Sequence, residues 1–369
     1  MDVRAYYLHL SVDHRTGEFD GDVRIEFANP PSSFELDSVD LSVRSVALDG
    51  IAVPFRMDVG RGRLSVEGGA DSPSNCRVEF HGTARSGMLS GPYLSRFGEG
   101  SLWTTMLYPS GCRRIFPCFD EPTSKAVFHV SVSADPAVRV ISNAPVEDVS
   151  SVDGRRVWKF QPTPKMSTYL LYIGVGAFEE VHRSENGLEV VVATAPGLES
   201  RADFALRHAP AMVHAFDRYY QIPYPLPKLH LVAVPDFWPG GMENWGAIAF
   251  AEHLLLVEPR TTPEFERWVL ETLAHEIAHQ WFGNLVTMAW WNDFWLNESF
   301  ATFAAYRIID QLGIEQDMWY DAYRGFFDSA YLADGFSSTH PIELPVQGPD
   351  DTLQVAPESP TGRAPQCCA

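Results

Sequence analysis

The chain has 369 residues and a net charge of −20, with 45% hydrophobic and 21% charged residues. This length is too great for one ordinary hydrophobic core and predicts two domains. The composition excludes an intrinsically disordered chain, and the negative charge repels phosphate backbones, so we expect no nucleic-acid partner.

The cysteines and the apolar segments bear on the cellular compartment. The five cysteines are scattered and odd in number, which is not the pattern of a disulfide framework. The segment from Met1 to Tyr7 lacks the apolar core of a signal peptide, and no apolar run approaches the roughly 20 residues that cross a bilayer. We therefore expect a cytoplasmic protein that does not bind membranes.

Residues 1 to about 180 have the pattern of β-strands. Apolar and polar residues alternate in Tyr7–Val12 and in Val23–Phe27. Further strands are expected at Leu41–Leu48, Val127–Val132, Val157–Phe160 and, as the last one, Ser167–Gly174. The segment predicts an antiparallel, sandwich-like domain in which alternate side chains face the core.

From residue 181 onward the pattern changes to mixed helix and strand. Arg201–Tyr220 has the apolar periodicity of a helix, and Leu229–Val234 reads as a strand. A further helix should begin at the capping residue Thr262, with a proline in its first position, and end where Gly283 follows Phe282.

Two histidines on this last helix can bind one metal ion. In the run His275-Glu276-Ile277-Ala278-His279 the imidazoles are four residues apart and lie on one helix face. Glu276 lies about 100° around the helix from His275, so it can reach a water at the metal without binding the metal. The alternative is a chance match to this short pattern, against which the helix caps argue.

Catalytic zinc needs a third protein ligand and an open position. Glu298 follows His279 in a segment whose apolar residues fit a second, buried helix. Those residues are Phe294, Leu296, Phe300, Phe303 and Ala304. The other common pattern needs a glycine and a histidine where this chain has Phe282 and Leu285, so the His/His/Glu type is favoured.

A zinc site of this type predicts hydrolysis. Zinc lowers the pKa of a water that it binds to about 7, and Glu276 would accept the proton of this water and pass it to the leaving amine. We expect one Zn²⁺ per chain, held by His275, His279 and Glu298. The glycosylation pattern Asn297-Glu298-Ser299 falls inside this site and is read as a chance match.

Several runs resemble the aminopeptidase N family of zinc metallopeptidases, of the gluzincin type. They are similar in particular to the archaeal members that trim peptides released by tricorn or the proteasome. The runs are Arg113–Pro122, Met166–Leu171, Gly240–Ile248, the zinc motif and Thr339-His340-Pro341-Ile342. The resemblance covers residues 1 to about 351.

The resemblance implies an α+β multidomain fold. Residues 1–180 would form an N-terminal antiparallel β-sandwich or saddle domain, and residues 181–351 an incomplete, thermolysin-like α/β catalytic domain. In this family the segment Gly240-Gly241-Met242-Glu243-Asn244 binds the peptide substrate. Glu243 would bind the free α-amine, and Gly241, Met242 and Asn244 would contact the peptide next to it.

The chain departs from the family pattern in two places. Tyr108 stands where members usually have a second amine-binding residue, unless the alignment slips in this loop. The family tyrosine that steadies the oxyanion should fall near Thr361, but the tail of residues 352–369 is Pro-rich and has no tyrosine. We expect this tail to be unstructured, and a frameshift or truncated gene model would explain it better than natural divergence. We also expect that the helical C-terminal domain of the family is missing.

The sequence therefore predicts a zinc-dependent aminopeptidase that releases N-terminal residues from peptides, with a functional link to tricorn or the proteasome. One alternative is a zinc-binding fragment that binds peptides without turnover, because the oxyanion tyrosine and the C-terminal domain are absent. A weaker alternative is a relative of the leukotriene-hydrolase members, which share the Gly-Gly-Met-Glu-Asn form.

Overall fold

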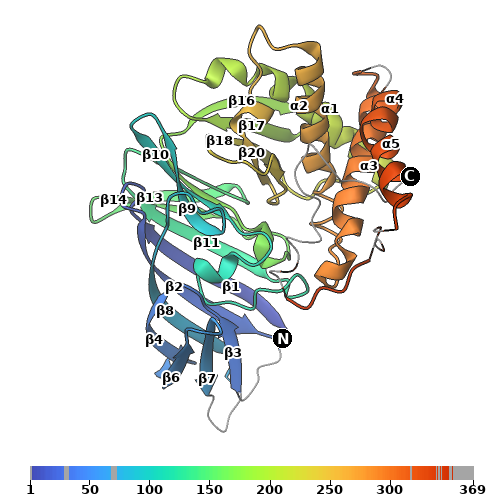
Figure 1. The fold of residues 1–369 in the computed structure, drawn as a ribbon. Helices are drawn as coiled ribbons and strands as arrows, with labels where there is room; N and C mark the ends of the chain where they lie inside the picture. The colour runs from blue at the N-terminus through green and yellow to red at the C-terminus, as the bar shows by residue number, and fades with distance from the viewer. Residues whose placement is uncertain are drawn as a thin grey trace. The chain divides into compact units, whose positions relative to one another are not determined.

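The computed structural model describes residues 2–28, 33–67, 73–315 and 318–337, together with residues 339, 341, 343–348 and 351. The chain divides into two compact units, the N-terminal unit (Met1–Phe178) and the C-terminal unit (Glu179–Ala369). The first consists mainly of strands, and the second combines strands and helices (Figure 1). The α+β class expected from the sequence is confirmed. The predicted tail of residues 352–369 lies outside the described residues.

The described residues of the N-terminal unit form three sheets. Eight strands form one sheet in the order β13-β14-β11-β1-β2-β8-β4-β5, and smaller sheets follow the orders β12-β15-β10-β9 and β3-β7-β6. The elements are β1 (Val3–Val12), β2 (Glu18–Phe27), β3 (Ser33–Asp37), β4 (Ser42–Leu48), β5 (Ile51–Ala52), β6 (Phe55–Asp58), β7 (Arg63–Glu67), β8 (Asn75–Thr83), β9 (Gly91–Phe97), β10 (Gly100–Met106), β11 (Val127–Ala134), β12 (Arg139–Ser142), β13 (Val146–Val152), β14 (Arg155–Phe160) and β15 (Ile173–Gly176), with short 3-10 helices η1 (Cys112–Arg114) and η2 (Thr168–Leu170).

The alternation seen in the sequence sets the register of the first hairpin. Along β1 the side chains of Tyr6, Leu8 and Leu10 are buried, while Tyr7, His9 and Ser11 between and after them are partly exposed. In the antiparallel pairing of β1 with β2, Leu8 lies opposite Val23, so both strands present apolar residues to the same core.

Two expectations for the N-terminal unit were wrong in part. The pairing of β1 with β11 is parallel, although the alternation predicted antiparallel strands throughout. The expected last strand, Ser167–Gly174, begins instead with the 3-10 turn η2. The turn forms because Ser167 donates a hydrogen bond to the Pro122 carbonyl and Thr168 donates one to Asp120, and β15 starts only after it.

In the part of the C-terminal unit that the structure describes, five strands form a sheet in the order β16-β17-β18-β20-β19. The pairs β17–β18 and β18–β20 are parallel, and the outer pairs are antiparallel. The elements are β16 (Glu179–Glu185), β17 (Leu188–Thr194), η3 (Glu199–Arg201), α1 (Asp203–Tyr220), β18 (Lys228–Val234), β19 (Gly241–Met242), β20 (Ala247–Ala251), η4 (Glu252–Leu254), α2 (Pro263–Ala278), η5 (Trp291–Asp293), α3 (Trp295–Leu312), α4 (Met318–Ala322), the π-helix η6 (Tyr323–Phe327) and α5 (Asp328–Asp334).

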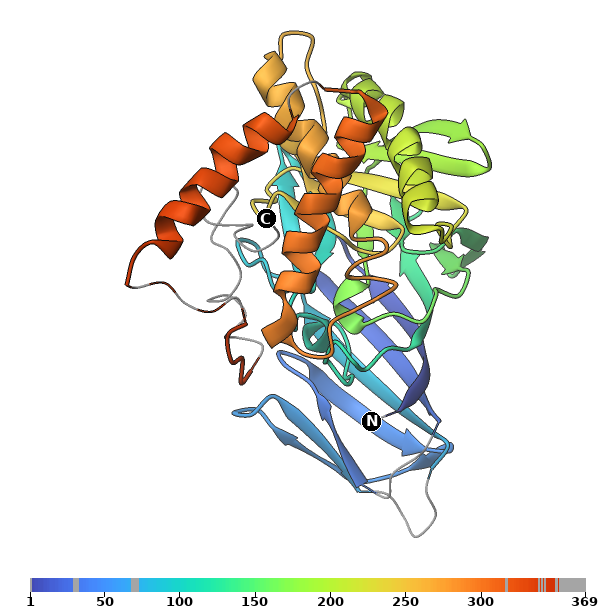
Figure 2. The same cartoon turned by 90° about the vertical axis from the view of Figure 1, so that its right-hand side faces the viewer.

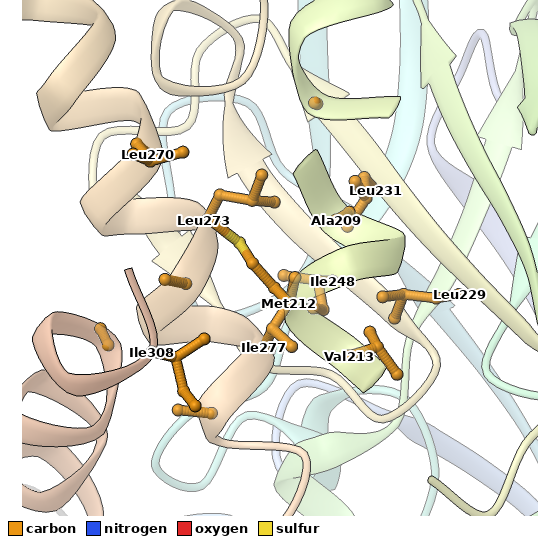
Figure 3. Close-up of a cluster of buried hydrophobic side chains, with 14 of the residues drawn as sticks. Ala209, Met212, Val213, Leu229, Leu231, Ile248, Leu270, Leu273, Ile277 and Ile308 are labelled. Carbon is orange, nitrogen blue, oxygen red and sulfur yellow. The ribbon is translucent and has the colours of Figure 1, made fainter. Parts of the chain in front are cut away.

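Helices α1, α2 and α3 share one buried apolar core with the sheet. Figure 3 shows Met212 of α1 among Leu273 and Ile277 of α2 and Ile248 of β20. Helices α2 and α3 pack against each other, and both can be followed in Figure 2. This packing holds the histidines of α2 opposite the N-terminal turns of α3.

Candidate active site

Helix α2 begins as the sequence predicts. Thr262 is its N-cap, and the Thr262 side chain accepts a hydrogen bond from the amide of Phe265, with Pro263 in the first position. The predicted end at Phe282 was wrong, because α2 ends at Ala278 and His279 is its C-cap. Two features end the helix here. The His279 ring forms a hydrogen bond with the Phe282 carbonyl. Gly283 then turns the backbone away, with a φ of +121° that favours glycine.

Three side chains predicted to bind metal lie together. The Nε2 atoms of His275 and His279 are 2.9 Å apart. Oε2 of Glu298, from α3, lies 3.2 Å from Nε2 of His275 and 3.7 Å from Nε2 of His279. The three residues form one of the groups able to hold a metal ion among the described residues.

The donor set and its surroundings fit zinc. Zinc–ligand bonds of about 2.0–2.2 Å separate the ligand atoms of a tetrahedral site by about 3.3–3.6 Å, and the three measured separations bracket this value. Metal-binding histidines usually donate their second ring N–H to a fixed acceptor. Here Nδ1 of His275 lies 3.1 Å from the Thr302 hydroxyl, and Nδ1 of His279 lies 2.9 Å from the Phe282 carbonyl.

The buried carboxylates and imidazoles perturb one another strongly. Burial lowers the pKa of His279, but the carboxylates of Glu243 and Glu298 outweigh burial and raise it to about 10. Burial raises the pKa of Glu298, yet His279 and His275 hold it well below its usual range. The pKa of His275 is lowered by burial and by the neighbouring His279.

Glu276 has the environment of a carboxyl group that holds a proton readily. Burial, with smaller contributions from Glu243 and Glu298, raises the pKa of Glu276 well above its usual value. Its Oε2 atom has no hydrogen-bond partner among the described residues. The carboxylate packs so closely against β19 that a Cβ atom on Gly241 would overlap it.

The segment from Gly241 to Asn244 lies at the edge of the five-stranded sheet. Gly241 and Met242 form β19, which pairs with β20 on one side and has no strand on its other side among the described residues. Glu243 follows directly and is only 5% exposed, so its carboxylate is buried at this edge. Asn244 is also buried.

Three side chains of the C-terminal unit donate hydrogen bonds to Glu243. Its main-chain carbonyl accepts hydrogen bonds from the Gln280 and Asn284 side chains, at 3.2 Å and 2.8 Å. Its carboxylate accepts one from Asn297, at 3.2 Å. The Glu243 carboxylate is also close enough to His279 to raise the pKa of its ring.

Sequence reasoning missed the residues that support this site. Asn297 and Thr302 contact the two histidines, and Gln280 and Asn284 hold Glu243. The available signal was the position of Asn297 beside Glu298 and of Thr302 one helical turn later. The expectation that Leu296 is buried was wrong, because Leu296 is 41% exposed in the first turn of α3.

Tyr108, which stands where family members usually have a second amine-binding residue, belongs to the N-terminal unit, where its ring lies against Tyr169. The expected effect of this departure on amine binding stays a prediction. His340, Ile342 and Thr361 lie outside the described residues.

A second group with metal-binding residue types lies in the N-terminal unit: Cys112, Cys118 and Asp120. Asp120 is already bound by Arg113, at 3.0 Å, and by Thr168, at 2.7 Å. Burial raises the pKa of both thiols, so they stay protonated near neutral pH. We interpret this group as part of the packing around Arg113.

Among the described residues, no helix combines the length and the apolar character that crossing a membrane requires.

The site combines a histidine pair one helical turn apart, a glutamate from the next helix and a second, buried glutamate. This combination on an α+β scaffold is typical of metallopeptidases. The chain belongs to peptidase family M1. The model of the peptidase M1 N-terminal domain matches residues 3–170, and that of the peptidase family M1 domain matches residues 204–357.

Curated relatives are similar in sequence to this chain over most of its length. A leucyl aminopeptidase from Saccharolobus solfataricus is 38% identical over 96% of this chain and 45% of its own length. The tricorn protease-interacting factor F2 of Thermoplasma acidophilum is 38% identical over 98% of this chain and 45% of its own length. Aminopeptidase N of Lactococcus lactis subsp. lactis is 34% identical over 94% of this chain and 42% of its own length. The chain thus spans less than half the length of these relatives.

Proposed function

We propose that this chain carries the catalytic site of a zinc-dependent aminopeptidase, which releases N-terminal residues from peptides. One observation carries the proposal: the His275, His279 and Glu298 cluster lies beside a buried carboxylate, Glu243, at the open edge of a sheet. The family and the names of its relatives support the same activity.

His275, His279 and Glu298 would hold one zinc ion. The donor set supports this choice, because two imidazole nitrogens and one carboxylate form a common catalytic zinc site. When bound, zinc would polarise the peptide carbonyl and make a water more acidic. The Thr302 hydroxyl and the Phe282 carbonyl would keep the second nitrogens of the two rings engaged.

Glu276 would act as the general base and then as the general acid. Its high pKa, caused by burial and by neighbouring carboxylates, favours uptake of a proton from the attacking water. The same proton would then pass to the leaving amine. Gly241 leaves room for the carboxylate in this position, because a Cβ atom there would overlap it.

Glu243 would bind the ammonium group of the peptide N-terminus. A fixed carboxylate beside the metal ligands rewards a positive charge at that distance, and internal segments of a peptide have no such charge. The open edge of β19, at Gly241 and Met242, would pair with the peptide backbone, and Asn244 belongs to the same segment. These features explain a preference for terminal bonds.

The biological setting is also a proposal. One relative is named as a tricorn protease-interacting factor, which supports peptides from a larger protease as the substrates. The cytoplasmic location expected from the sequence fits this supply of peptides.

The test combines metal analysis with aminoacyl-coumarin substrates. The purified chain should bind about one zinc per molecule and release coumarin from free-amine substrates, and a chelator should abolish this release. Glu276→Gln should lower kcat by about 10²–10⁴ with zinc retained. Glu264→Gln, in the exposed first turn of the same helix, is the matched control. Protein that binds zinc without chelator-sensitive release would be a peptide-binding protein instead, and protein without zinc would contradict the proposed site.

A further inference from the structure

Asn297 lies between the two halves of the proposed site. It is 2% exposed and stands in the first turn of α3, next to Glu298. Its Oδ1 atom lies 3.0 Å from Nδ1 of His279, and its Nδ2 atom lies 3.2 Å from Oε1 of Glu243. One side-chain amide therefore contacts both a proposed metal ligand and the proposed amine-binding acid.

The chemistry of the neighbours fixes the orientation of this amide. The NH₂ end of Asn297 donates to Oε1 of Glu243, because a carboxylate oxygen is an acceptor. The oxygen of Asn297 then faces His279 and accepts its Nδ1–H. The Phe282 carbonyl, also an acceptor, requires a hydrogen on the same nitrogen. In the neutral ring this leaves the Nε2 lone pair for the cluster.

The backbone at Gly283 leaves room for the oxygen of Asn297. Gly283 follows Phe282 with φ of +121°, and a Cβ atom there would overlap Oδ1 of Asn297. His279 itself is 1% exposed, and Glu243 is 5% exposed, so water does not compete freely for these hydrogen bonds.

We propose that Asn297 is a positioning residue that couples His279 to Glu243. The proposal rests on the proposed function, because it assigns a purpose to the link between metal ligand and amine-binding acid. By holding both groups, one rigid amide fixes the distance between the peptide N-terminus and the bond that is cut. Asn297 itself needs no contact with the substrate.

The first test exchanges the two members of the pair. Asn297→Asp places a second carboxylate against Glu243 and should lower the unfolding midpoint of the metal-free chain by about 5 °C or more. Adding Glu243→Gln restores the hydrogen bond in the opposite direction, with the amide at position 243 as donor and the carboxylate at position 297 as acceptor. The double variant should therefore recover at least half of the loss, whereas Glu243→Gln alone should not raise the midpoint of the wild type.

The second test measures zinc affinity by competition with a chromophoric chelator, which needs no turnover. Asn297→Leu keeps the side-chain size and removes both hydrogen bonds. We expect zinc binding about 10–100-fold weaker, the usual effect of losing a partner of a metal-binding histidine. A role in folding alone would lower the unfolding midpoint and leave the zinc affinity of the folded protein unchanged.

The matched control is Asn292, whose Nδ2 atom donates to Oε1 of Glu343 at 2.9 Å in an exposed pair of the same unit. The exchange of Asn292→Asp with Glu343→Gln should show no rescue and no change in zinc affinity. The coupling is overturned if Glu243→Gln has the same effect with and without Asn297→Asp, or if Asn297→Leu binds zinc within twofold of the wild type. Wild-type protein that binds no zinc would overturn the proposed function and this coupling together.

Discussion

Gly241 of β19 and Glu276 of α2 touch so closely that any side chain at position 241 would occupy the space of the Glu276 carboxylate. The contact joins the proposed peptide-binding edge to the proposed proton carrier. The atoms in the way, Cγ, Cδ and Oε1 of Glu276, belong to a flexible side chain, which can move aside without moving the backbone.

Gly241→Ala should therefore separate activity from stability. We expect the displaced Glu276 carboxylate to lower kcat at least about tenfold, a part of what general acid–base catalysis contributes. The unfolding midpoint should change by less than about 2 °C, because only a side-chain end must shift. Gly60→Ala is the control, since only the Asp58 side chain, at 3.6 Å, lies near a Cβ there. Unchanged kcat in Gly241→Ala, measured on aminoacyl-coumarin substrates, would refute the positioning of Glu276 by this contact.

Thr302 should contribute to metal binding through His275. Its hydroxyl donates to the Glu298 carbonyl at 3.1 Å, so its oxygen is left to accept from Nδ1 of His275. Thr302→Val removes this acceptor at nearly constant volume and should weaken zinc binding about 10–100-fold in a chelator competition.

The control for this variant lies on α2. Thr272 donates the same kind of bond to the carbonyl of Trp268, four residues earlier, so Thr272→Val removes an equivalent bond that involves neither histidine. Equal zinc affinities in both variants would mean that Thr302 has no part in orienting His275.

The cluster could be predicted because its determinants are local. A four-residue spacing puts His275 and His279 on one face of any helix, and the cap at Thr262 marks where α2 begins. Apolar periodicity located α3 and with it Glu298. In the N-terminal unit, alternation located β1 and β2 for the same reason, since period-two burial follows from strand geometry alone.

The supporting hydrogen bonds could not be predicted, because they depend on how separate elements pack. Whether Asn297 reaches Glu243 depends on the angle between α3 and the edge of the sheet, which no local pattern encodes. The parallel pairing of β1 with β11 joins segments more than 100 residues apart and leaves no turn signal. The early end of α2 depends on the bond from the His279 ring to the Phe282 carbonyl, which only a folded turn can make.

Lys228 should make the stability of the C-terminal unit depend on pH. Its side chain is almost fully buried and donates to the Gly246 carbonyl at 2.8 Å. Burial lowers the pKa of Lys228 from 10.5 to about 7, although Glu180 and Glu189 act in the opposite direction. Between these two pKa values the unfolded chain binds more protons than the folded chain, so this residue makes stability rise with pH from about 7 to about 10.5.

Lys228→Met should remove this contribution. In denaturant unfolding the difference in stability between wild type and variant should shift in favour of the wild type, by up to about 4 kcal/mol, from pH 7 to pH 10. Comparing the two proteins cancels the contributions of all other titrating groups. A difference that stays constant with pH would show that Lys228 keeps its proton in the folded chain.

Arg113 should be among the residues on which the N-terminal unit depends most. It binds Asp120 at 3.0 Å and Asp37 at 3.1 Å, and both carboxylates are almost fully buried. Arg113→Met would leave these carboxylates with too little compensation, which in buried pairs costs about 3–5 kcal/mol of unfolding free energy. The neighbouring Arg114 pairs with Asp40 nearer the surface, so Arg114→Met should cost at most about 1 kcal/mol. Chemical denaturation of the two variants decides the matter: equal losses would show that burial of Asp37 and Asp120 adds nothing to the strength of the Arg113 interactions.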